Sequence, residues 1–200
     1  MKPLKKEDIK QEVFDLYDAY AHNKLERRDF VQKLSMYAVG GITVPSLMSF
    51  LMPDYENTFL VDKNNPNLDS GFITYNSVKG GGEIKALLSK PKSAENKLPG
   101  IVVVHENRGL NPYVEDTARR AALAGFITIA PDALSPLGGY PGNDDEGREM
   151  QRTRDRDKML EDFIAAFEYL KNHEGCNGKI GVVGFCFGGW ISNMMAVKVN

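Results

Sequence analysis

Cysteine, histidine and net charge are all scarce in this chain of 200 residues, which has two cysteines, three histidines and a formal net charge of −2. Cys176 and Cys186 alone cannot build a disulfide framework. The histidines lie far apart without metal-ligand spacing, so we expect no metal site and no cofactor. The nearly balanced charge gives no reason to expect a nucleic-acid partner, which would normally show a clustered basic excess.

Long apolar runs are missing as well, and none approaches the roughly 18 residues of a membrane span. A composition of 42% hydrophobic and 26% charged residues is nevertheless typical of a folded globular protein. Arginines are frequent in residues 148–156, but acidic residues alternate with them, and we interpret this stretch as a solvated helix face rather than a binding patch.

The pair Arg27-Arg28 leaves two interpretations of the protein's location. We expect a cytoplasmic protein in which these arginines are exposed on amphipathic helices. The alternative is periplasmic export, because the stretch resembles a twin-arginine signal and the moderately apolar residues 34–51 follow it. The pair lies far from the N-terminus, and no small-x-small cleavage site follows before Asp54, which favours the first interpretation.

Two regions are predicted, a helical extension with its linker over residues 1–70 and an α/β domain over residues 71–200. In the extension, apolar residues recur at helical steps from Lys5 to Met52, and Gly40-Gly41 and Pro45 are expected to break the pattern. Residues 53–70 are rich in Asn, Asp and Pro and predict a linker over the domain surface. No chemistry is assigned to this region.

Strand and helix patterns alternate in the second region. The predicted strands span residues 72–78, 83–89, 101–104, 126–130 and 179–183. A glycine turn joins the first two strands into an antiparallel hairpin, a helix over 111–124 separates the third and fourth, and one long helix between Gly142 and Gly175 precedes the last. Wholly apolar strands covered by helices predict a mainly parallel sheet that is buried on both faces.

The stretch Gly184-Phe-Cys-Phe-Gly-Gly-Trp190 follows the last strand and opens a helical stretch. This is the context of a nucleophile elbow, in which a strained tight turn lifts a reactive side chain above the sheet. Gly184 and Gly188 would leave room where a Cβ would collide, and the helix N-terminus favours a thiolate at Cys186. The competing interpretation is a small buried cysteine in a glycine-rich turn.

An elbow of this kind predicts an oxyanion site from two backbone N–H groups, those of Phe187 and of Asn107 in the loop after the third strand. Glu106 stands at the carboxyl end of that strand, where open α/β sheets place their ligands. Its other interpretation is a surface salt bridge to Arg108. We interpret His105 as a packing residue rather than a base.

Three motifs occur in order: His-Glu-x-x-Gly from His105, Ala-x-x-Gly-Phe followed by Ala-Pro-Asp over residues 122–132, and the Cys186 elbow. Together they resemble the dienelactone hydrolase family of α/β-hydrolases from residue 72 onward. The resemblance implies that Cys186 is the nucleophile, that Glu106 holds the resting thiol and helps it ionise, and that a small-molecule ester or lactone is the substrate.

The chain departs from that family where an arginine should follow Pro131-Asp132. Either the substrate lacks a carboxylate, or Arg108 supplies the charge. The loop 135–140 is expected to shape the pocket, with Tyr140 as a lid residue and Trp190 as a further pocket residue.

A free thiol is only a few per cent ionised at neutral pH, so catalysis needs a base. The fold places the triad acid and histidine after the nucleophile, yet residues 187–200 contain no Asp, Glu or His. We therefore expect a truncated hydrolase that lacks its C-terminal strands, with the last strand as an exposed edge open to self-association. The alternatives are an inactive remnant and an interaction module led by the N-terminal helices.

Overall fold

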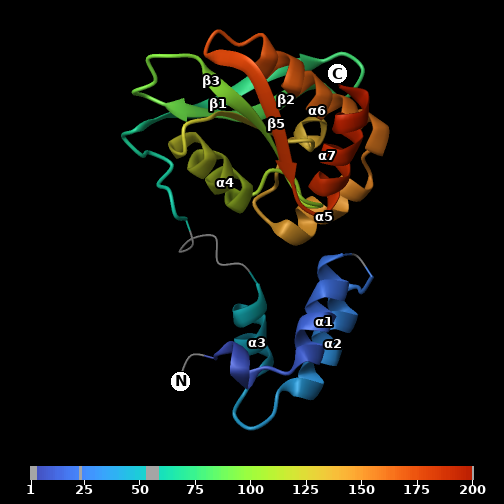
Figure 1. Ribbon diagram of the computed structural model, residues 1–200. Helices are drawn as coiled ribbons and strands as arrows, with labels where there is room; N and C mark the ends of the chain where they lie inside the picture. The colour runs from blue at the N-terminus through green and yellow to red at the C-terminus, as the bar shows by residue number, and fades with distance from the viewer. Residues whose placement is uncertain (1–3, 23, 53–58, 200) are drawn as a thin grey trace. The chain divides into compact units, whose positions relative to one another are not determined.

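The chain divides into two structural units, Met1–Asn57 and Thr58–Asn200. The computed structural model describes residues 4–22, 24–52 and 59–199 (Figure 1). Residues 53–58 of the predicted linker lie outside this described part. The last linker residues, 68–70, belong instead to the first strand of the second unit.

The first unit is helical, as predicted. Its elements are the 3₁₀ helices η1 (Lys6–Asp8) and η2 (Ser35–Tyr37) and the α-helices α1 (Gln11–Ala21), α2 (Arg27–Leu34) and α3 (Val44–Leu51). Arg27 and Arg28 open α2 and are exposed. The expected break is confirmed, because Gly40 and Gly41 have positive φ between η2 and α3, and Pro45 occupies the first turn of α3, where its missing N–H costs no hydrogen bond.

Aromatic packing joins the helices of this unit. The rings of Tyr20 and Phe30 stack with centroids 4.6 Å apart, and both side chains are fully buried. Leu34 and Leu47 complete the contact between α2 and α3 within the same apolar cluster. The unit thus has a core of its own. None of the described helices of either unit combines the length and apolar character needed to cross a membrane.

The second unit contains a five-stranded sheet in the order β1-β2-β4-β3-β5. The strands are β1 (Leu68–Ser77), β2 (Gly82–Pro91), β3 (Leu98–Val104), β4 (Ile127–Pro131) and β5 (Cys176–Gly184). β2 pairs antiparallel with β1 and β4, whereas β3 pairs parallel with β4 and β5. The predicted hairpin and parallel strands are therefore confirmed.

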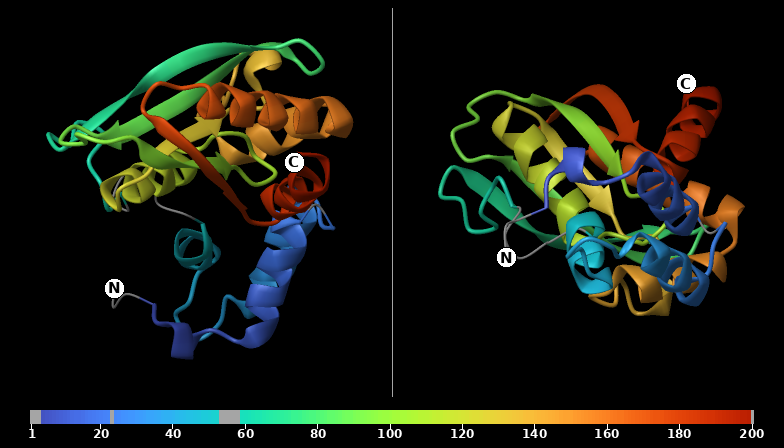
Figure 2. Two further views of the ribbon diagram at one scale, coloured as in Figure 1. Left: turned by 45° about the horizontal axis from the view of Figure 1, so that its top comes forward. Right: turned by 90° about the horizontal axis from the view of Figure 1, so that it is seen from below.

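Helices cover both faces of the sheet. α4 (Pro112–Leu123) packs on one face against Leu87, Val103 and Ala130. α6 (Arg156–Lys171) and α7 (Phe187–Lys198) pack side by side on the other (Figures 1 and 2). The alternation of Val102 and Val103 between the two clusters follows from the two-residue period of a strand.

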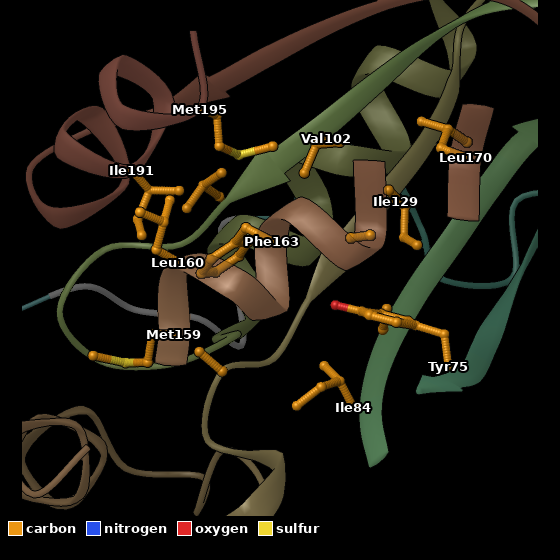
Figure 3. Packing of buried hydrophobic residues seen from close by; sticks show 14 of the residues in the cluster. Tyr75, Ile84, Val102, Ile129, Met159, Leu160, Phe163, Leu170, Ile191 and Met195 are labelled. Carbon is orange, nitrogen blue, oxygen red and sulfur yellow. The ribbon is translucent and has the colours of Figure 1, made fainter. Parts of the chain in front are cut away.

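The larger cluster lies between the sheet and these two helices. Phe163 from α6 meets Val102 from β3 and Ile191 from α7 in its centre (Figure 3). All three side chains are fully buried. β5 lies at the edge of the sheet and Val183 is 37% exposed, which agrees with the expectation that the last strand is an exposed edge.

The single long helix predicted after Gly142 is wrong. α5 (Asp144–Arg152) ends before Asp155, which caps a separate α6 by accepting hydrogen bonds from the N–H groups of Asp157 and Lys158 at 2.9 and 3.0 Å. Asp and Asn favour this position because their short side chains satisfy the first unpaired N–H groups of a helix.

The interpretation of residues 148–156 as a solvated face holds for Arg152 and Arg156, which are exposed, but not for two other arginines. Arg148 is buried, and Arg154 donates to the fully buried Asp162 carboxylate at 2.6 Å. Asp162 also accepts from Gly81 N–H at 2.6 Å, and the hydroxyl of Tyr75 donates to its backbone carbonyl at 2.8 Å. The hydrogen bond from Gly81 to Asp162 thus connects the β1–β2 turn to α6.

Candidate active site

Cys186 occupies a sharp turn between β5 and α7. Its backbone has φ 55° and ψ −118°, and it is the only non-glycine residue with positive φ in the described part of the chain. Such a conformation costs on the order of 1–3 kcal/mol and persists only where the surrounding structure enforces it. The side chain is exposed, so the interpretation as a small buried cysteine is wrong.

Two glycines allow this turn. A Cβ on Gly184 would lie 2.6 Å from the carbonyl carbon and oxygen of Gly188. A Cβ on Gly188 would lie 2.6 Å from the carbonyl oxygen of Val104 and 2.8 Å from that of His105. The predicted collisions are confirmed, and they show that the first turn of α7 presses on the end of β3.

The ends of β3 and β5 bring Glu106 and Cys186 to the same edge of the sheet. Val104 and Gly184 are register partners in these neighbouring parallel strands, and each candidate residue lies two positions beyond its partner. Glu106 is partly buried, as is Asn107 beside it. The backbone N–H of Phe187, the first residue of α7, has no hydrogen-bond partner among the described residues. A donor at this position can bind an anion.

Arg108 and Tyr140 converge on one carboxylate, that of Asp144 at the start of α5. Arg108 Nη1 lies 3.1 Å from Asp144 Oδ2, and the Tyr140 hydroxyl donates to Oδ1 at 2.9 Å. The alternative interpretation of Glu106 paired it with Arg108 in a salt bridge, whereas the structure pairs Arg108 with Asp144. Burial, with the nearby Asp144 charge, holds the pKa of Tyr140 well above its usual range, so the phenol stays protonated.

Asp132 organises the loops beside this site. Its carboxylate accepts from the N–H groups of Leu110, Leu134 and Tyr140 at 3.3, 3.0 and 2.7 Å. Sequence reasoning assigned no role to Asp132 or Asp144. For Asp132 a signal was present, because it directly follows β4, at the same edge as Glu106. The segment from Ser135 to Gly139 lines a hollow of about 350 Å³ against β1 and β2.

Trp190 lies one turn into α7. Its backbone N–H donates to the carbonyl of Cys186 at 3.2 Å, and the centroid of its ring lies 6.1 Å from that of Phe187. The guanidinium of Arg156 covers the ring at 4.1 Å, a cation–π contact that ties α7 to the start of α6. These contacts hold Trp190 beside the turn.

The histidines near the sheet lie at its opposite ends. His105 follows β3, is fully buried, and contacts the rings of Phe163 and Phe187. His173 precedes β5 and accepts from Gly175 N–H at 3.0 Å. Because β5 runs from Cys176 to Gly184, roughly 30 Å of extended strand separates His173 from Cys186.

A sharp strand-to-helix turn that exposes a cysteine at the carboxyl edge of a mainly parallel sheet is typical of an α/β-hydrolase. Comparison with known proteins narrows the class. The chain belongs to the dienelactone hydrolase family, whose model matches residues 84–200. A second family model, described as YqhI-like, matches residues 1–40.

Individual relatives agree with this assignment. "Putative hydrolase fragment YghX" of Escherichia coli K12 is 51% identical over 114 residues, 57% of this chain and 97% of that protein. A carboxymethylenebutenolidase of Pseudomonas sp. strain P51 is 33% identical over 60% of this chain and 52% of its own length. The solved structure of m3DLH superposes with a TM-score of 0.53 at 26% identity, covering 66% of this chain and 55% of that one. The chain thus spans about half the length of the carboxymethylenebutenolidases it matches.

Proposed function

We propose that Cys186 accepts the acyl group of a carboxylic ester or lactone. The observation that carries this proposal is the exposed sulfur held in a strained backbone conformation at the start of α7. Strain of this kind, at a residue that is not glycine, accumulates where a side chain has to be presented in one direction. Family membership and the names of the relatives support an ester or lactone as the substrate class.

The reaction begins when Cys186 loses its proton to the Glu106 carboxylate. The thiolate attacks the substrate carbonyl carbon, the carbonyl π electrons move to oxygen, and the N–H groups of Phe187 and Asn107 stabilise the oxyanion. When the carbonyl reforms, the C–O bond of the ester or lactone breaks, and the leaving alkoxide takes a proton from Glu106. An acyl thioester on Cys186 results.

The proposal covers the acylation half-reaction, for which Cys186, Glu106 and the two backbone N–H groups supply every group named above. Arg108 and Tyr140, gathered on Asp144, border the site in this proposal and limit the shape of the acyl group.

A chromogenic ester tests the proposal. Wild-type protein mixed with p-nitrophenyl acetate should release about one equivalent of p-nitrophenolate per chain in a burst, as expected for an acyl-enzyme intermediate. Mass spectrometry should place the acetyl group on Cys186. Cys176, the other cysteine, is buried and provides the matched control.

Cys186→Ala should abolish the burst, whereas Cys176→Ala should retain it. Equal release from wild type and Cys186→Ala, or acetylation spread over surface lysines, would refute the assignment. Continued release beyond one equivalent in wild type would instead show that the chain completes the hydrolysis.

A further inference from the structure

His105 makes two hydrogen bonds that determine its protonation state. Its Nδ1 lies 2.6 Å from the carbonyl oxygen of Glu106, and its Nε2 lies 3.2 Å from the backbone nitrogen of Ala133. A carbonyl oxygen can only accept and a backbone N–H can only donate, so the ring carries its proton on Nδ1 and accepts at Nε2. Burial lowers the pKa of His105, which favours the neutral ring that this pattern requires.

The hydrogen bond from His105 to the Glu106 carbonyl also affects the orientation of the next residue, Asn107. The carbonyl of Glu106 and the N–H of Asn107 belong to one planar trans peptide, in which they point in opposite directions. Because the Glu106 carbonyl oxygen lies 2.6 Å from Nδ1 of the buried imidazole, this carbonyl points toward the ring, and the Asn107 N–H points away from it. The direction of one proposed oxyanion donor is thus set by a hydrogen bond on the far side of the same peptide.

Phe187, whose backbone N–H is the other proposed donor, also contacts this imidazole. The ring of His105 stacks on that of Phe187 with centroids 6.0 Å apart and planes inclined by 23°. The ring of Phe163 makes an edge contact with the same imidazole, with centroids 5.5 Å apart. The carbonyl of His105 limits the approach of Gly188 in the same turn of α7. The start of α7 and the loop after β3 therefore both contact the His105 side chain.

We propose that His105 is a positioning residue that orients the two backbone N–H groups of the oxyanion site. This inference rests on the proposed function and assigns His105 no direct contact with substrate. A role as general base does not fit, because both ring nitrogens are engaged and the side chain is fully buried. A purely structural role would make both hydrogen bonds matter for folding and neither matter for acylation.

Two amide variants separate the two bonds. The side-chain nitrogen of asparagine occupies nearly the place of Nδ1, so His105→Asn can still donate to the Glu106 carbonyl while leaving Ala133 N–H unpaired. The amide of glutamine reaches the place of Nε2, so His105→Gln can accept from Ala133 but loses the donor at Nδ1. Each variant keeps one bond, which makes them controls for one another.

The first measurement compares two reactions at Cys186. The p-nitrophenyl acetate burst requires an oxyanion site, whereas alkylation by iodoacetamide is a displacement that forms no oxyanion. His105→Gln should slow acylation by roughly tenfold or more, less than the 10²–10³ that follows deletion of a donor, while alkylation stays within about twofold and His105→Asn acylates within about threefold of wild type. Equal slowing in both variants, or normal acylation in His105→Gln, would overturn the proposal.

The second measurement does not depend on ester chemistry. In ¹H–¹⁵N spectra the amide resonances of Asn107 and Phe187 should move in His105→Gln and return toward their wild-type positions in His105→Asn. If wild type is alkylated but never acylated, the proposed function fails, and these resonances alone decide the role of His105. Resonances unchanged in His105→Gln, or displaced equally in both variants, would then refute it.

Discussion

Replacement of Gly188 by alanine should destabilise the second unit through a single added carbon. That carbon would lie 2.6 Å from the carbonyl oxygen of Val104, about 0.8 Å short of the 3.4 Å at which ordinary contact begins. The obstacle is backbone at the end of a core strand and cannot rotate aside, so α7 must move. Overpacking of this kind costs about 1–3 kcal/mol. For a unit of this size the melting temperature should fall by about 3–10 °C.

Urea and thermal unfolding followed by tryptophan fluorescence measure this effect well, because Trp190 is the only tryptophan and lies two residues from the substitution. Gly181→Ala is the matched control, since a Cβ at this neighbouring β5 position meets nothing within 4 Å. It should change the unfolding free energy by less than about 0.5 kcal/mol. Coincident melting of the two variants, with unchanged Trp190 emission, would refute the packing of α7 on β3.

Three further substitutions probe the frame around the site. Arg154→Met should cost about 3–5 kcal/mol in urea unfolding because it strands the buried Asp162 carboxylate, and adding Asp162→Asn should recover part of the loss. Asn111→Ala should cost about 1 kcal/mol by removing the cap that accepts from Val114 N–H at 3.1 Å; an unchanged denaturation midpoint would contradict this. Because burial lowers the pKa of His105 below 6.5, its contribution to stability is complete above that pH and is lost as pH falls toward the folded pKa. Melts between pH 7.5 and 5 should therefore show a smaller acid loss in His105→Asn than in wild type.

The sheet and its order of elements could be predicted because the local signals agree with the tertiary structure. The apolar run before His105, the glycine turn near Gly81 and the proline after Asn111 each admit few conformations. The elbow was predictable for the same reason, since a cysteine between glycines after an apolar strand has few structural uses. Here sequence spacing alone carries the information.

Other features depend on contacts that no local pattern encodes. Arg154 looks like one more charge in a mixed stretch, and only the burial of Asp162, eight residues later, makes it an internal ion pair. Asp144 gathers Arg108 and Tyr140 because α5 lies against the loop after β3, a contact set by tertiary packing across 36 residues. Asp155 stands among several other charged residues, and only the hydrogen bonds it accepts in the folded chain mark it as the cap of α6.

The positive φ at position 186 makes cysteine less favourable for stability than glycine, although the proposed chemistry needs the cysteine thiol. Glycine would adopt φ 55° without the penalty that a cysteine pays there, so a population of variants screened only for heat resistance should drift toward Cys186→Gly. The same population screened for ester acylation should keep the thiol. Position 186 is thus a site at which directed evolution would reveal what the chain is selected to do.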